Sequence, residues 1–409
     1  MKTTNKRKII NDPVHGFISI PDELSYDIIN HPFFQRLRRI KQLGLTSLVY
    51  PGAVHTRFHH ALGALHLMDM ALSTLISKGV EISPEESQAA MLAILLHDIG
   101  HGPFSHALER SIVQDMDHED LTLLFIERLN SEFNNQLEET KKVFNNTHSK
   151  PFLHQLVSGQ LDVDRLDYLS RDSFYTGVSE GIIGTERIIK MLNVSQGELA
   201  VEIKGIYSIE KFIISRRLMY WQVYFHKTAV AAEQLLVKIL ERASYLAKNG
   251  EKLNNDDILY EFLKNSYNLE SFNNDFELLS KFATLDDNDI MYCIKQWCWH
   301  SDKILSMLSN MLIHRNLFKI EMSDTPFDEE YIENKREEFI NKLNINKKDI
   351  SYFVFGKSIS NKGYTSEDED IKILTQKQEL KVVTEISQQL NFIKSKEYST
   401  KYYLCFPKY

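Results

Sequence analysis

The feature that most constrains this chain is an apolar helical stretch that runs directly into a group of histidines and an aspartate. Residues 89–96 are all apolar, and residues 83–86 (Ser-Pro-Glu-Glu) have the form of a capping box with proline at the first helical position. The next ten residues, 97–106, contain three histidines and one aspartate. Such groups are unfavourable at the buried end of a helix unless they are paired or hold a metal ion.

Metal binding is the interpretation that we favour for this block. Neutral imidazole and carboxylate are the ligands expected for a divalent ion such as Mn, Fe or Zn. Neighbouring helical residues point ~100° apart, so His97 and Asp98 can reach one ion only at or beyond the helix end, which Gly100 and Gly102 supply. The simpler alternative is a buried histidine beside a capping aspartate. Two residues do not complete a coordination sphere, so further ligands are expected elsewhere in the chain.

Two other blocks offer such ligands. Residues 55–63 open an otherwise apolar helix with three histidines, and residues 161–172 contain four aspartates. In the second block Asp164, Tyr168 and Asp172 recur at four-residue steps and therefore lie on neighbouring parts of one helical face. The alternative for this block is a solvated, salt-bridged surface, but its leucines favour packing against the core.

Composition and charge limit the class of protein. The 409 residues carry 48 Lys plus Arg against 56 Asp plus Glu, a formal net charge of −8. Nucleic-acid-binding domains are usually basic, so nucleic acid is not expected as the main partner. Only 16 Gly and 9 Pro are present while 43% of the residues are hydrophobic, which favours a helix-rich fold with a large core. The three cysteines fit neither a disulfide framework nor a zinc motif.

No segment is expected to enter a membrane or to direct secretion. The basic and polar residues 1–11 do not resemble a secretory signal. The longest apolar run is far shorter than the ~20 residues of a membrane span. We therefore expect a cytoplasmic protein with no membrane partner.

Periodicity divides the chain into a large helical domain, residues 1–325, and a small C-terminal α+β region, residues 326–409. The expected fold class is therefore mainly α. In the first part we predict helices at residues 62–76, 84–96, 121–129 and 209–244, with polar joints at 249–256 and 273–289. In the second part we predict helices at 329–343 and 382–390, β-segments at 350–355, 371–374 and 402–406, and a loop at 357–370.

The three histidine and aspartate blocks, together with residues 11–16 and 34–44, resemble the HD-domain phosphohydrolases. The likeness is to their deoxynucleoside triphosphate triphosphohydrolase branch, which includes bacterial dGTPases and the vertebrate sterile-alpha-motif HD enzyme. It extends over residues 8–319 and implies a helical HD core at about residues 50–175. The implied reaction converts a deoxynucleoside triphosphate, with dGTP favoured, to deoxynucleoside and inorganic triphosphate.

The resemblance also implies roles for individual residues. The implied ligands of a divalent metal ion (Mn, Mg, Fe or Zn) are His60, His97, Asp98 and Asp164. The implied catalytic residues are His101, His106, the proton donor His118, and Glu119, which would orient His118. The implied substrate-binding residues are Gln42, Arg57, Arg165, Tyr168, Asp172, Arg216, Tyr220 and Tyr224. A tyrosine against the sugar edge would exclude a 2′-hydroxyl. Relatives often have lysine at position 165 and histidine at position 220.

A second set of residues matches positions where family members bind activating nucleotides between subunits. These residues are Asn11, Asn30, Gln35, Arg38, Arg187, Lys204, Arg315 and Lys319. Asn30 stands where the vertebrate enzyme uses aspartate to recognise guanine, and asparagine offers one acceptor and one donor instead of two acceptors. The resemblance thus implies a nucleotide effector such as dATP and a homo-oligomer, with a tetramer favoured. Exposed basic residues without such a role are the alternative.

Two other functions stay open at this point. One is an HD phosphohydrolase acting on nucleoside monophosphates or signalling nucleotides. The other is a nucleotide sensor with little turnover. The pair Tyr168 and Asp172 and the block at residues 216–227 favour the triphosphatase, because they match that branch.

Overall fold

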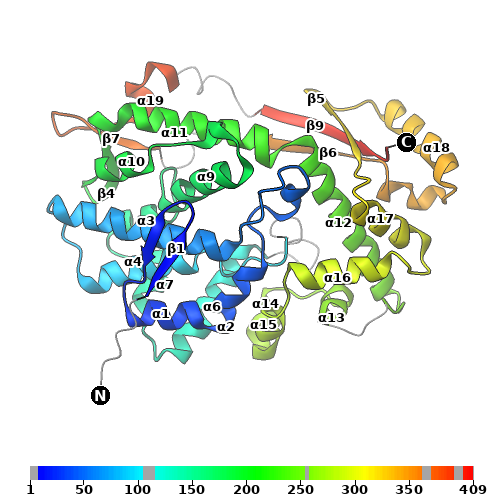
Figure 1. Cartoon of the computed structure of the whole chain (residues 1–409), viewed down its shortest axis with the longest axis horizontal. Coiled ribbons are helices and arrows are strands. Elements are labelled where there is room, and N and C mark those ends of the chain that lie inside the picture. The colour runs from blue at the N-terminus through cyan, green and yellow to red at the C-terminus, as the bar shows by residue number, and fades with distance from the viewer. Residues whose placement is uncertain (1–7, 105–115, 254–257, 362–369, 391–398, 409) are drawn as a thin grey trace.

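The computed structural model describes residues 8–104, 116–253, 258–361, 370–390 and 399–408, and it is mainly helical (Figure 1). The helices before residue 200 are α1 (Glu23–Asn30), α2 (Pro32–Gln35), α3 (Arg57–Ser77), α4 (Pro84–Leu96), α6 (His118–Glu132), α7 (Glu138–Phe144), α8 (Pro151–Val157), α9 (Val163–Thr176) and α10 (Thr185–Met191). Those after it are α11 (Ile206–Met219), α12 (Lys227–Lys248), α13 (Ile258–Lys264), α14 (Leu269–Asn274), α15 (Phe276–Phe282), α16 (Asp287–Trp297), α17 (Lys303–Ile313), α18 (Glu329–Leu343) and α19 (Val383–Ile386).

Helices α3, α4 and α9 form the layer that carries the site. Helix α3 buries residues on nearly every side, as expected of a helix inside a core, and it packs against both α4 and α9. Helix α4 begins with the predicted capping box, in which Ser83 Oγ accepts from the Glu86 amide at 3.2 Å and Glu86 Oε2 accepts from the Ser83 amide at 2.8 Å. The last residues of α4, up to Leu96, are fully buried, so His97 follows directly from the core.

The strands form three small sheets. They are β1 (Ile9–Asp12), β2 (Gly16–Ser19), β3 (Leu192–Ser195), β4 (Glu198–Glu202), β5 (Lys319–Ser323), β6 (Phe355–Asn361), β7 (Lys372–Leu374), β8 (Leu380–Val382) and β9 (Ser399–Phe406). Strands β1 and β2 pair as a hairpin, β3-β4-β7-β8 form the second sheet, and β5-β9-β6 form the third. The only parallel pair among the described strands is β4 with β7; every other pair is antiparallel.

Two of these sheets join the predicted helical domain to the C-terminal region. Strand β5 pairs with β9, with Ile320 opposite Cys405, and β4 pairs with β7, with Val201 opposite Ile373. Strand β6 also contacts α12, where Lys238 Nζ lies 4.7 Å from the centroid of the Phe355 ring (Figure 1). The structure therefore holds residues on both sides of position 325 in shared sheets.

Several predicted boundaries need correction. Residues 347–352 form a 3₁₀ helix where a β-segment was predicted, and the strand begins only at Phe355. The predicted loop at 357–370 starts as part of β6, and its residues 362–369 lie outside the described residues. The predicted joint at 273–289 contains α15 and the start of α16, because Asp275 and Asp286 accept backbone hydrogen bonds as helix N-caps. The predicted helix at 209–244 is interrupted by a π-helical turn at Tyr220–Tyr224.

One predicted helix is confirmed in full. Helix α18 covers Glu329–Leu343, as predicted. All three cysteines are free and buried. Among the described residues, no helix is both long and apolar enough to cross a membrane.

Candidate metal centre and nucleotide site

Helix α3 places His60 at the centre of the site, where the side chain is fully buried. Its Nδ1 lies 2.7 Å from Oδ2 of Asp167 on α9. Burial alone would raise the pKa of Asp167, but the Arg171 guanidinium and hydrogen bonds from His15 and His60 hold that pKa well below its usual value. An ionised carboxylate only accepts hydrogen bonds, so His60 donates through Nδ1–H, and in the neutral ring that a metal ion requires its Nε2 carries a lone pair.

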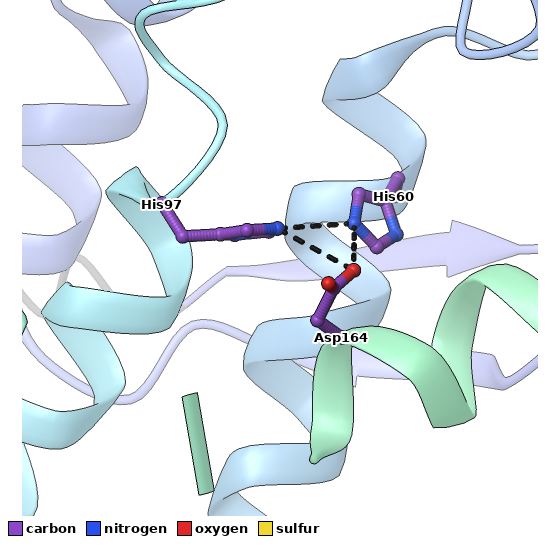
Figure 2. A group of neighbouring side chains, drawn as sticks. All are labelled: His60, His97 and Asp164. Atoms are coloured by element: carbon purple, nitrogen blue, oxygen red, sulfur yellow. Dashed lines mark hydrogen bonds and ion pairs between the residues drawn. The ribbon is translucent and has the colours of Figure 1, made fainter. Parts of the chain in front are cut away.

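Two further lone-pair atoms converge on that nitrogen (Figure 2). His60 Nε2 lies 3.3 Å from Nε2 of His97 and 3.0 Å from Oδ1 of Asp164, and the last two atoms are 3.6 Å apart. His97 Nδ1 donates to the Ile94 carbonyl at 2.6 Å, so His97 Nε2 also offers a lone pair. These three atoms need a proton or a cation among them, and two neutral imidazoles with a carboxylate suit a divalent cation. The residues present therefore fit a metal ion.

The electrostatics of the cluster favour positive charge at this point, carried either by protons on the histidines or by a cation. Burial alone would lower the pKa of His60, yet its hydrogen bonds to Asp164 and Asp167 raise it to about 10. Burial would raise the pKa of Asp164, but hydrogen bonds from His60 and His97 lower it. The carboxylates thus attract positive charge to this point.

Asp98 lies at the edge of the cluster. Its Oδ1 is 3.4 Å from His97 Nε2 and its Oδ2 is 3.7 Å from His60 Nε2. The Arg57 guanidinium donates to Oδ2, and His101 Nδ1 lies 3.2 Å from Oδ1. The structure therefore brings all four predicted ligands together, with Asp98 also serving as the partner of Arg57.

The predicted catalytic residues are brought together only in part. The rings of His101 and His118 stack with centroids 3.9 Å apart, and burial together with the charge of Arg57 lowers the pKa of His101 well below its usual value. Glu119 is exposed, and its carboxylate makes no hydrogen bond within the described residues, so an orienting role stays a prediction. His106 lies outside the described residues.

The predicted sugar-facing residues form a compact group beyond Asp164. The rings of Tyr168, Tyr220 and Tyr224, here called the tyrosine cluster, meet edge to face with centroids 6.2 and 5.1 Å apart. Tyr224 donates to Oδ2 of Asp172 at 2.6 Å, and His55 Nε2 lies 2.8 Å from Oδ1 of the same carboxylate. Both oxygens of Asp172 are therefore held in fixed directions.

The three arginines among the predicted substrate-binding residues are already paired. Arg165 donates to Asp162 at 2.9 Å and Arg216 donates to Gln160 at 2.9 Å. Arg57 is paired with Asp98 as described. Gln42, also predicted to bind the substrate, differs from them because its Oε1 is buried and has no hydrogen-bond partner among the described residues.

The predicted effector residues lie in several local groups. Arg38 donates to Gln35 at 2.9 Å, and the Arg187 guanidinium donates to the Lys204 carbonyl at 3.2 Å. Arg315 donates to the Leu48 carbonyl, and Lys319 pairs with Glu321. Asn30 donates to the Tyr26 carbonyl, and Asn11 lies in β1. Within the described part of the chain no hydrogen bond connects one group to another. These contacts are therefore local, and an effector site built from these residues stays a prediction.

Five residues at this site were missed by the sequence analysis. They are Asp12, His15, His55, Asp167 and Arg171, and all of them bind other residues of the site. Asp12 and His15 lie in the block at residues 11–16, which was noted for its resemblance but assigned only through Asn11. Four aspartates were counted in residues 161–172, but the sequence carries no signal for which of them faces His60.

Comparisons with known proteins agree with this geometry. The sequence matches the HD domain over residues 57–172 and the HD associated region over residues 183–267. A crystal structure of a phosphohydrolase from Bacteroides thetaiotaomicron is 51% identical, with a TM-score of 0.94 over 98% of this chain and 100% of that one.

Two curated relatives extend the comparison. The uncharacterized protein YwfO of Bacillus subtilis is 36% identical over 324 residues, which is 77% of this chain and 72% of that protein. The deoxynucleoside triphosphate triphosphohydrolase SAMHD1 homolog of Dictyostelium discoideum is 31% identical over 265 residues, and the match spans about half (51%) of its length. With the histidine and aspartate cluster on α3, α4 and α9, these matches show that the chain belongs to the HD-domain phosphohydrolase family.

Proposed function

We propose that this protein is a metal-dependent deoxynucleoside triphosphate triphosphohydrolase, with dGTP favoured as substrate. The observation that carries the proposal is the layout of α9. This helix supplies Asp164 to the histidine cluster and, four and eight residues later, Tyr168 and Asp172 to the tyrosine cluster. A metal centre and a set of groups suited to a nucleoside therefore share one rigid element.

The chemistry follows from the groups at hand. His60, His97, Asp164 and Asp98 would hold a divalent cation, which supplies Lewis acidity toward a phosphoryl oxygen when bound. Arg165 and Arg216 would bind the triphosphate and stabilise charge that develops on its oxygens. His118 would donate a proton to the departing nucleoside oxygen, a role that imidazole groups commonly fill near neutral pH. Tyr168 would lie against the sugar edge, where a 2′-hydroxyl has no room.

We also propose activation by a second nucleotide, with dATP as the first candidate, at a site formed between subunits of a homo-oligomer. The match of the effector residues to positions where family members bind activating nucleotides between subunits supports this. A tetramer is the favoured assembly. A cytoplasmic location remains part of the same proposal.

The test is product analysis with purified protein. The protein is incubated with Mn²⁺ and each dNTP, alone and in pairs, and the phosphate product is identified by chromatography. Release of inorganic triphosphate supports the proposal, and stimulation by a second dNTP supports the effector site. Release of orthophosphate or pyrophosphate alone, or turnover only of monophosphates or signalling nucleotides, would contradict it.

Substitutions at the cluster test the metal centre, and a histidine outside it provides the matched control. His97→Ala and Asp164→Asn should lower kcat by at least about 100-fold and reduce bound Mn²⁺, because each removes one of the converging donors. His154→Ala alters a histidine whose Nδ1 binds the Val143 carbonyl away from the cluster, and it should keep both. Unchanged rates for His97→Ala would rule out this centre as the site of catalysis.

A further inference from the structure

We propose that the N-terminal hairpin β1–β2 is a working part of the metal centre, and that Asp12 and His15 of this hairpin set its metal affinity as positioning residues. The inference assumes only that the histidine cluster binds a divalent cation, and it adds residues far from that cluster in sequence. It is independent of which nucleotide the protein hydrolyses.

The physical link is a chain of buried hydrogen bonds. Asp167 accepts from His60 Nδ1 at 2.7 Å, and its two oxygens also accept from Arg171 Nε and Nη2 at 2.8 and 2.9 Å. Arg171 in turn donates from Nη1 to Asp12 Oδ2 at 2.7 Å and from Nη2 to Oδ1 at 3.3 Å. From the turn of the same hairpin, His15 Nε2 lies 2.6 Å from Asp167 Oδ1.

Burial makes the residues of this hydrogen-bond network depend on one another. The side chains of Asp167 and Arg171 are fully buried, and those of Asp12 and His15 are 4% and 10% exposed. Charged groups in such surroundings cannot turn to water for a replacement partner, so loss of one partner leaves another unpaired. The two carboxylates and one guanidinium therefore depend on each other for their orientation.

The hairpin is itself held in shape by Asp12. Its Oδ1 accepts from the backbone amides of Val14 and His15 at 3.0 and 2.9 Å, which forms the turn that carries His15 toward Asp167. One side chain thus both closes the turn and fixes Arg171. His60 must present Nε2 in one direction to act as a ligand. Asp167, which binds its Nδ1, and the residues that orient Asp167 therefore affect how well His60 binds a metal ion.

Mn²⁺ binding to the full chain, stripped with EDTA and titrated by calorimetry, tests the proposal. Asp12→Asn keeps the size of the side chain but removes the charge that orients Arg171, and we expect Mn²⁺ affinity to fall about 10-fold. His15→Phe keeps a ring beside His66 but removes the bond to Asp167, and a loss in the same direction is expected.

The matched control is Asp302→Asn. Asp302 also accepts from an arginine, Arg242, and from a backbone amide, that of Leu305, but it has no connection to the cluster. The Asp302→Asn substitution should lower the melting temperature without changing Mn²⁺ affinity. If folded Asp12→Asn and His15→Phe both bind Mn²⁺ within twofold of the unaltered protein, the proposal is overturned.

The coupling between metal binding and order in the hairpin acts in both directions, which allows a second measurement that needs no variant. If the hairpin favours metal, then metal must favour the ordered hairpin to the same extent. Mn²⁺ should therefore slow hydrogen exchange of amides in β1 and β2 more than in the β5–β9 pair. Equal slowing in both places would overturn the proposal, whereas failure of the unaltered protein to bind Mn²⁺ would instead remove the metal centre itself.

Discussion

At the scale of single residues, the site depends on a glycine that permits close contact between helices. A Cβ on Gly63 of α3 would lie 2.0 Å from Oδ1 of Asp167 and 2.2 Å from Nη2 of Arg171. No real Cβ tolerates such distances, and the atoms in the way are fixed by the buried hydrogen bonds of α9. Glycine at this position therefore lets the ion pair of α9 lie directly against the backbone of α3.

Gly63→Ala should destabilise the protein and weaken metal binding together. Overpacking of this kind typically costs about 1–3 kcal/mol, and the displaced Asp167 would lose its alignment with His60. Urea unfolding and Mn²⁺ titration measure the two effects. Gly184→Ala is the control, because a Cβ there meets only Arg187 Cβ at 3.9 Å. A Gly63→Ala protein with unaltered Mn²⁺ affinity would contradict the expectation.

At the scale of elements, local signals predicted helices well and their ends poorly. Helix α4 was predictable from its capping box and continuous apolar run, and helix α18 from its amphipathic pattern. The aspartates at 275 and 286 were read as joints, but each caps a helix, and composition alone does not distinguish the two uses. The hairpin β1–β2 has strands of only four residues, too short to give a clear alternation.

Helix α12 carries a carboxyl group that should make stability depend on pH. Burial raises the pKa of Glu233 to about 7, whereas the unfolded chain has a value near ~4.3. Between these values the folded protein retains a proton that the unfolded chain releases, so the free energy of unfolding falls as pH rises through this window.

Glu233→Gln removes that dependence. Relative to the unaltered protein, the variant should gain stability between pH 5 and pH 8, with no further gain above. Urea unfolding of both proteins at the two pH values measures the difference. If the two proteins differ in free energy of unfolding by the same amount at pH 5 and at pH 8, the Glu233 carboxyl does not cause the pH dependence.

At the scale of the whole molecule, the two predicted regions are joined by more than a linker. Strand β5 lies before residue 325 and pairs with β9 near the C-terminal end, while β7 extends the sheet of β4. Arg242 of α12 adds a second kind of connection, since it donates to Asp302 of the helical region and at 3.2 Å to Asp349 of the C-terminal region. The division near residue 325, proposed from sequence, therefore marks a change in composition more than a break in packing.

A fragment of residues 1–325 should consequently be much less stable than the full chain. Its strand β5 would lose its partner and the apolar residues under β9 would be exposed, which favours aggregation. Thermal unfolding and size-exclusion chromatography of the fragment and the full protein measure this. A fragment that unfolds cooperatively and binds Mn²⁺ like the full chain would establish residues 1–325 as an independent unit.

The same long-range contacts explain what the sequence could not provide. The four metal ligands could be proposed from sequence because each sits in a local block that resembles the family. The bond between Arg171 and Asp12 joins residues 159 positions apart, and that between His60 and Asp167 spans 107. The local sequence around these residues does not indicate which residue each one binds, so only the packing of α3, α9 and the hairpin reveals the pairs.

The contact of α3 with α9 at Gly63 also bears on how the choice of metal could change. His60 and Asp164 belong to these two helices, so their separation is set by how closely the backbones approach and not by loops that could adapt. Ions of different radius need different separations between their ligands. We therefore expect selectivity among divalent ions to respond to the residue at position 63, which touches no ion, and a chain redesigned for another metal would have to be altered there first.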